Sequence, residues 1–125
     1  MILKEGVTQA GTKPPTWWAC GIAEMIYRYE GLQLVITSLT DSHEDRPESL
    51  HNKGLAVDFR TKNIYHGVVV SIHKQLVTIL NPLGYDVVLY VAPDIPHIHC
   101  EYHPKSAENW QRFDRPLPRK DDFVV

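Results

Sequence analysis

The chain is organised around two stretches of sequence, SLHNKGLAVD at residues 49–58 and DIPHIHCE at residues 94–101. Polar and apolar side chains alternate along the end of the first stretch and most of the second, which is typical of β-strands with one buried side. We therefore expect one strand over residues 55–60 and another over residues 97–102. Each strand would turn its apolar face to a core and its polar face away from it.

The polar residues of these two stretches suit a metal ion. Asp58 belongs to the polar face of the first predicted strand, and His51 precedes that strand. His97 and His99 share one face of the second predicted strand, so both can reach a single site. Imidazole and carboxylate are what a catalytic zinc ion takes, with three protein ligands and one position left for water. The sequence therefore predicts a site for one zinc ion.

Hydrophobic periodicity predicts the remaining elements outward from these strands. They are a helix capped by Thr16 and running to about Glu30, a strand over residues 32–38, a helix from His66 to about Leu80, and a strand from Tyr85 to Val91. The order α-β-β-α-β-β predicts an α+β fold, a small antiparallel sheet with helices packed on one face. We expect a single domain over residues 1–125, with its core at about residues 16–104, an extended lead-in before it and a C-terminal arm at residues 105–125.

Composition and charge argue against several classes of protein. A chain of 125 residues with 43% hydrophobic residues suits one globular domain, and its two cysteines cannot supply a disulfide scaffold. The formal net charge of −2 lacks the excess of Lys and Arg that nucleic-acid binding requires. We find no signal peptide and no apolar run long enough to span a bilayer. We therefore expect synthesis in the cytoplasm, no nucleic-acid partner and no stable membrane association, while the oligomeric state stays open.

Further residues near the two stretches could serve the metal chemistry. Gly54 lets the chain turn tightly between His51 and Asp58, with no side chain to block a metal. Ser49 could hydrogen-bond a ligand carboxylate or orient His51, since metal-bound imidazoles usually have such a partner. Asp94, in the loop before the last strand, could take a proton from the attacking water and hand it to a leaving amine.

The two stretches resemble one family of zinc peptidases, the D-alanyl-D-alanine carboxypeptidases and their phage endolysin relatives. The matching residues are Ser49, His51, Gly54, Ala56 and Asp58 in the first stretch, and Asp94, His97 and His99 in the second. The family shares its fold with the amino-terminal signalling domain of hedgehog proteins, and the resemblance covers roughly residues 16–104. It implies hydrolysis of peptidoglycan stem-peptide bonds next to D-amino acids, in phage lysis, in a virion or in cell-wall remodelling. A holin-type partner would then release the enzyme to the wall.

The resemblance also implies a role for each matching residue. His51 and Asp58 match the first two zinc ligands. Members with a His-x-His pair use the second histidine, which favours His99 as the third ligand, while members with an acidic residue three positions before a single histidine would favour His97. We assign His99 to the metal, and His97 to orienting water or steadying the oxyanion. Asp94 matches the general base under both alignments.

The chain departs from the family pattern on the substrate side. Many members carry a Gly-Tyr-Arg-Ser run after the strand that matches residues 34–38, and its arginine binds substrate. That run is missing here, and Arg60 or Arg46 could replace its arginine. His43, in the long polar loop over residues 39–50, could also face substrate. Which peptide bond is cut, and whether the enzyme is an endopeptidase or a carboxypeptidase, stays open.

Other readings of the same residues lead to different expectations. The chain could be a zinc-containing binding module of the same fold without catalysis, an option suggested by the comparison with hedgehog proteins. Glu101 is an alternative candidate for the base, although it lies farther along the strand. Cys100 faces away from the histidines and is predicted to be a core residue. The remaining histidines are predicted to be surface residues; they are His66, His73 and His103.

Overall fold

The computed structural model describes residues 1–41, 49–91 and 95–103 of the chain. His43, Asp94 and the C-terminal arm therefore lie outside the described residues. The described elements are β1 (Ile2–Leu3), α1 (Pro14–Tyr29), β2 (Val35–Ser38), β3 (Ala56–Arg60), α2 (His66–Leu80), the short 3₁₀ helix η1 (Asn81–Leu83), β4 (Tyr85–Tyr90) and β5 (His97–Tyr102). None of the helices in this part of the chain is long and apolar enough to cross a membrane.

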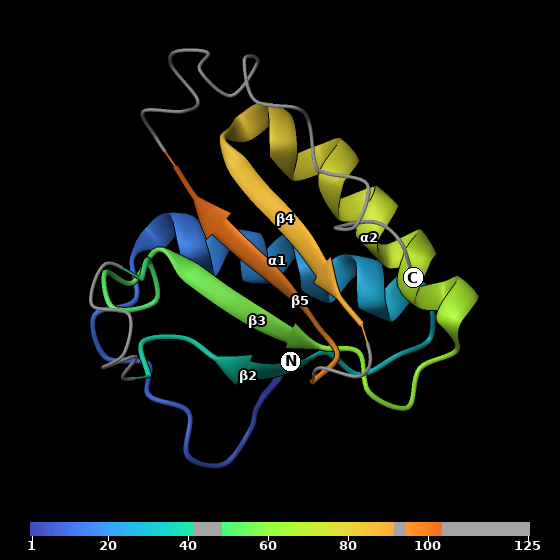
Figure 1. Cartoon of the computed structure of the whole chain (residues 1–125), viewed down its shortest axis with the longest axis horizontal. Helices are drawn as coiled ribbons and strands as arrows, with labels where there is room; N and C mark the ends of the chain where they lie inside the picture. The colour runs from blue at the N-terminus through green and yellow to red at the C-terminus, as the bar shows by residue number, and fades with distance from the viewer. Residues whose placement is uncertain (42–48, 92–94, 104–125) are drawn as a thin grey trace.

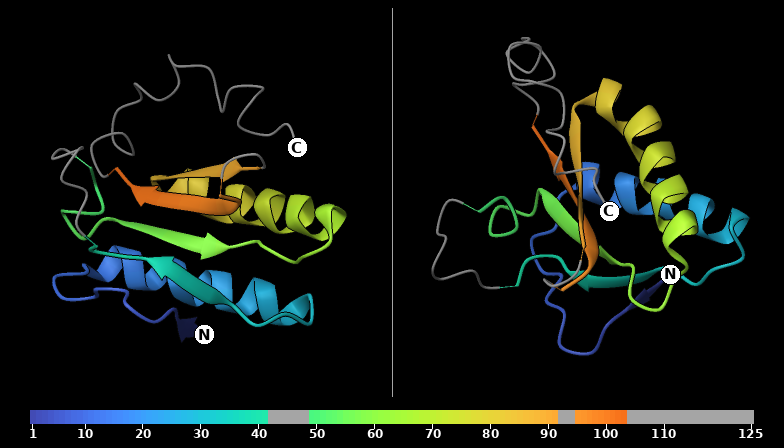
Figure 2. Two further views of the ribbon diagram at one scale, coloured as in Figure 1. Left: turned by 60° about the horizontal axis from the view of Figure 1, so that its bottom comes forward. Right: turned by 45° about the vertical axis from the view of Figure 1, so that its right-hand side comes forward.

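The described strands form one sheet in the order β1-β2-β3-β5-β4. β1 runs parallel to β2, and every other neighbouring pair is antiparallel. α1 passes behind the sheet and α2 lies along it beside β4 (Figures 1 and 2). We call the opposite face, on which no helix of the described residues packs, the uncovered face. The predicted α+β fold, a small antiparallel sheet with helices on one face, is confirmed, with one parallel pair at its edge.

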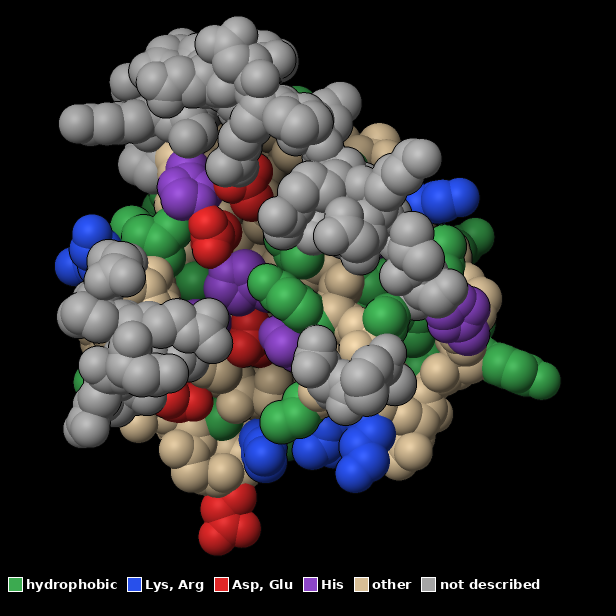
Figure 3. Space-filling view, viewed as in Figure 1, with side chains coloured by type: hydrophobic (Ala, Val, Ile, Leu, Met, Phe, Trp, Pro, Cys, Tyr) green, Lys and Arg blue, Asp and Glu red, His purple; other side chains and the backbone are tan. Residues whose placement is uncertain are grey.

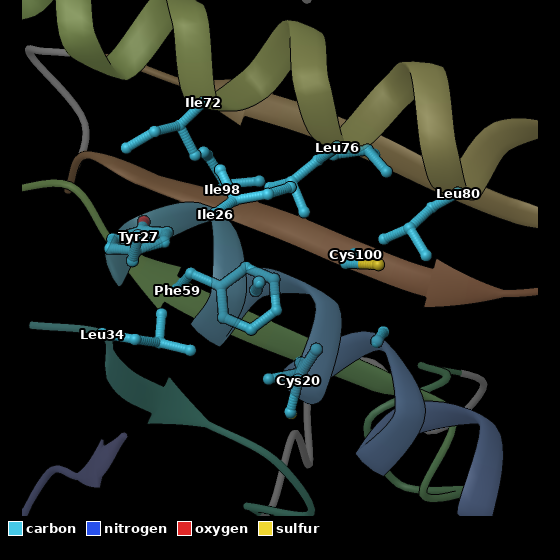
Figure 4. Packing of buried hydrophobic residues seen from close by; sticks show 14 of the residues in the cluster. Cys20, Ile26, Tyr27, Leu34, Phe59, Ile72, Leu76, Leu80, Ile98 and Cys100 are labelled. Carbon is cyan, nitrogen blue, oxygen red and sulfur yellow. The ribbon is translucent and has the colours of Figure 1, made fainter. Parts of the chain in front are cut away.

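The core lies between the sheet and the helices (Figure 4). From β3 and β5 it takes Val57, Phe59, Ile98 and Cys100, each at most 1% exposed. The ring of Phe59 meets that of Tyr27 from α1 edge to face, with 6.5 Å between the ring centres. Because neighbouring strand residues point to opposite faces, burying these side chains turns the polar residues between them to the uncovered face. The predicted alternation and the core position of Cys100 are therefore confirmed.

The predicted start and cap of the first helix were wrong. α1 begins at Pro14, since proline suits the first turn of a helix. Thr16 does not cap the helix: its hydroxyl is buried and donates to the carbonyl oxygen of Gly54 at 2.7 Å. The predicted extended lead-in contains the short strand β1, which pairs with β2. The amide of Ile2 donates to the carbonyl oxygen of Leu34 at 2.9 Å. Residues before Thr16 thus belong to the folded unit.

His73 is also placed differently from the prediction. It was expected at the surface, but it faces the sheet from α2 and is 2% exposed. Its Nε2 lies 3.1 Å from the carbonyl oxygen of Val87 on β4. A buried imidazole needs such a partner, so His73 helps to fix α2 against the sheet. His66, at the start of α2, is exposed as predicted.

Gly54 allows the turn before β3 to dock against the beginning of the chain. Its φ of +75° is one that L side chains rarely adopt. A Cβ at this position would lie 2.1 Å from the carbonyl oxygen of Gly11. The Gly54 carbonyl also accepts from the amide of Lys13 at 2.9 Å. This close contact between backbones therefore requires a residue without a side chain at position 54. The contact also fixes the turn that carries His51.

We expect Gly54→Ala to lower the free energy of unfolding by about 2–4 kcal/mol, because backbone strain and a backbone clash add together. Gly31→Ala is the matched control: its φ is +78°, but a Cβ there would meet nothing within 4 Å. It should cost only about 1 kcal/mol. Chemical denaturation of the full chain measures both values. Equal losses in the two variants would contradict the contact with Gly11.

Candidate metal centre

The pairing of β3 with β5 brings the predicted metal ligands together. In this antiparallel register Asp58 is opposite His99, and Arg60 is opposite His97. Directly opposite residues on one face have Cβ atoms about 5 Å apart. The carboxylate of Asp58 and the imidazole of His99 therefore meet on the sheet face that the helices leave uncovered.

His51 reaches the same point from the turn before β3. Its Nδ1 lies 2.8 Å from the carbonyl oxygen of Leu39, which can only accept, so Nδ1 carries the hydrogen and donates. Nε2 is then left to face Asp58 Oδ1 at 3.4 Å, where it can donate to the carboxylate when it carries a hydrogen and bind a metal through its lone pair when it does not. His51 is only 4% exposed. Its ring is thus held with a ligand atom directed at Asp58.

His99 is held between two carboxylates. Its Nδ1 lies 2.8 Å from Asp58 Oδ1, and its Nε2 lies 2.6 Å from Glu101 Oε1. The rings of His51 and His99 stand 5.1 Å apart, centre to centre. Together His51, Asp58 and His99 form a metal-ligand triad, with one candidate ligand atom from each residue and all of these atoms within 4.8 Å of one another.

The charges in the triad depend on one another. Burial disfavours ionisation of Asp58, but hydrogen bonds from His51 and His99 outweigh burial and hold its pKa well below the usual range. Burial also disfavours the charged form of His99, but hydrogen bonds to Asp58 and Glu101 outweigh it and raise the pKa of His99 to about 9. Without a metal, a proton on His99 therefore supplies positive charge between the two carboxylates.

The triad has the features expected of a metal site. It offers two imidazoles and a carboxylate, a common ligand set for a catalytic zinc ion. The second nitrogen of each imidazole is hydrogen-bonded, to Leu39 O and to Glu101, as in sites where such partners orient the ligands. Ser38, the register neighbour of Asp58 on β2, has a buried hydroxyl with no hydrogen-bond partner in the described part of the chain. Such a group commonly marks the place of an ion, water or ligand.

His97 lies beside the triad. Its Nε2 is 3.9 Å from Asp58 Oδ1, and its Nδ1 is 2.8 Å from the carbonyl oxygen of Ile95. The ring stacks on Tyr90 of β4, with 4.7 Å between the ring centres and an angle of 17° between the planes. The closest grouping of ligand atoms therefore includes His99, while His97 presents Nε2 at the edge of the same site.

The other predicted site residues that the structure describes, Ser49 and Arg60, lie near the triad without belonging to it. The hydroxyl of Ser49 accepts from the backbone amide of His51 at 3.2 Å, so it orients the turn, and Leu39 O orients the ring. Arg60 lies on β3, on the triad's face and two residues beyond Asp58. Asp94 and His43 lie outside the described residues, so their predicted roles remain predictions.

Next to the triad lies a group of side chains that was not predicted from the sequence. His103 was expected at the surface, but its Nε2 contacts Glu101 Oε2 and lies 3.4 Å from Asp86 Oδ2. One signal in the sequence could have found it. The alternation that puts His99 and Glu101 on one face of β5 puts residue 103 on that face too. Histidine and carboxylate side chains accordingly gather in one patch over β3 and β5 in the space-filling view (Figure 3).

Comparison with protein family models, with curated proteins and with solved structures finds no match to this chain. Support for a function therefore comes from the site itself and from the motif that led to it.

The raised pKa of His99 predicts how metal affinity depends on pH. Below about pH 9 the metal-free protein keeps a proton on His99, and a metal bound at Nδ1 must displace it. The affinity for Zn²⁺ should therefore rise about tenfold per pH unit and level off only near pH 9. A competition titration with a chromophoric chelator measures this dependence.

Glu101→Gln is the informative variant for this prediction, because it removes one of the carboxylates that raise the pKa of His99. The plateau of affinity should then move to lower pH. An affinity that already levels off above about pH 7 in the unmodified chain, as an ordinary histidine would give, would contradict the account.

Proposed function

We propose that this chain is a zinc-dependent peptidase that hydrolyses peptidoglycan stem-peptide bonds next to D-amino acids. The observation that carries the proposal is the triad of His51, Asp58 and His99, with ligand atoms within 4.8 Å of one another on the uncovered face of the sheet. The motif over residues 49–58 supports the substrate class, because it resembles that of the D-alanyl-D-alanine carboxypeptidases and phage endolysins. Action on the wall in lysis, in a virion or in wall remodelling is part of the proposal.

The triad would hold one zinc ion through His51 Nε2, Asp58 Oδ1 and His99 Nδ1. When bound, zinc would polarise the scissile carbonyl and make water a better nucleophile. Burial of the ligands supports this chemistry, since charges act more strongly where water is scarce. The hydrogen bonds of His51 and His99 to Leu39 O and Glu101 would keep both imidazoles aligned.

The remaining residues would act on the substrate. His97 presents Nε2 beside Asp58, where it could steady the oxyanion that forms on the scissile carbonyl. Arg60, opposite His97 on the next strand, could bind a substrate carboxylate. Asp94 would be the general base: it would accept a proton from the attacking water and give it to the leaving amine.

Incubation of the zinc-loaded chain with purified peptidoglycan, followed by mass spectrometry of the released fragments, tests the proposal. New amino termini or freed D-alanine are expected, and they would name the bond. Asp94→Asn should keep zinc and lose about 10²–10⁴-fold in rate, as for loss of a general base. His51→Ala should lose the zinc ion of the triad together with turnover, and His66→Ala, an exposed control on α2, should lose neither.

Two results would overturn the proposal. Turnover by His51→Ala would exclude the metal mechanism. Stem peptides that stay intact after incubation with a chain shown to hold zinc in the triad would favour the alternative, a zinc-containing binding module without catalysis. In that case Asp94→Asn would change neither the zinc content nor the peptides.

A further inference from the structure

A second group of metal-ligating side chains lies next to the triad, at the far end of the β4–β5 pair. Asp86 on β4 is directly opposite Glu101 on β5, and both point to the uncovered face of the sheet. His103 follows β5, and its amide donates to Gly84 O at 2.9 Å, which fixes the backbone where the strand ends. Asp86, Glu101 and His103 form what we call the β4–β5 cluster.

The geometry of the β4–β5 cluster suits a cation. Each residue offers one ligand atom, and these atoms lie within 4.8 Å of one another. His103 Nε2 lies 3.4 Å from Asp86 Oδ2 and also contacts Glu101 Oε2. The side chains are partly buried, at 17% exposed for Asp86, 25% for Glu101 and 30% for His103. They are therefore not freely solvated acids that happen to share a surface.

Positive charge stabilises the cluster. Like charges directly opposite each other on neighbouring strands destabilise the pair, so positive charge beside Asp86 and Glu101, from His103 or from a bound cation, offsets their repulsion. One nitrogen and two carboxylate ligands suit Zn²⁺, Mn²⁺ or Fe²⁺ better than Ca²⁺, which prefers six to eight oxygens. The cluster thus favours a divalent transition metal.

Glu101 divides its oxygens between the two centres. Oε1 faces His99 Nε2 of the triad, and Oε2 faces His103 Nε2 of the cluster. The same carboxylate can therefore orient the imidazole that binds the first ion, as carboxylates beside metal-bound histidines commonly do, and bind a second ion directly. The cluster itself does not need His51 or Asp58.

We propose that Asp86, Glu101 and His103 form a second site for a divalent transition-metal cation, beside the triad and linked to it by Glu101. This site is independent of any peptidase activity. It predicts that the chain binds two metal ions, and that either one can be removed without the other.

Equilibrium dialysis of the full chain against Zn²⁺ alone, with every variant held at the same pH of about 8, tests the proposal. The unmodified chain and His66→Ala should each bind two equivalents. His103→Ala and Asp86→Asn should each still bind the zinc equivalent of the triad, and each should lower the affinity for the second equivalent at least tenfold. His51→Ala should keep the cluster's equivalent, and His51→Ala combined with His103→Ala should bind none tightly.

Circular dichroism melts identify any variant that fails to fold, and Asp86→Asn decides the question if His103→Ala is one of these. Saturation of the unmodified chain at one equivalent would overturn the proposal. A second equivalent that persists unchanged in a folded Asp86→Asn or His103→Ala variant would overturn it too, because the ion would then lie elsewhere.

Discussion

The register between β3 and β5 is the constraint on which the site depends. It sets Asp58 opposite His99, while Phe59 and Ile98 are opposite each other on the buried face. A slip of one residue would turn the polar set into the core and expose the apolar set, at a cost of several kcal/mol. The hydrophobic core therefore enforces the pairing of carboxylate with imidazole, so fold and site are specified by the same alternating residues.

The second constraint is the turn that delivers His51. The carbonyl oxygen of Gly54 accepts hydrogen bonds from the amide of Lys13 and the hydroxyl of Thr16. These bonds connect the turn to the beginning of the chain and to α1. Leu39 O then selects the tautomer of His51 that leaves Nε2 available. A ligand outside the sheet is thus positioned by backbone carbonyls, which are rigid acceptors with little entropy to lose.

Local patterns predicted much of this fold. The bounds of α2 and β5 follow from periodicity over 15 and 6 residues. β1 was missed because a strand of 2 residues has no pattern of its own and forms only by pairing with β2. Thr16 carried a capping signal, but tertiary contact with Gly54 took its hydroxyl. The ligand residue types were predictable from sequence, whereas the partners Leu39 O and Glu101 required the register and the turn.

The central claim is that one metal ion is held by His51, Asp58 and His99. Crystals of the zinc-loaded chain, with diffraction data collected on both sides of the zinc absorption edge, test it most directly. We predict an anomalous peak within bonding distance of His51 Nε2, Asp58 Oδ1 and His99 Nδ1. A zinc ion bound through His97 in place of His99, or no peak at Asp58, would contradict it.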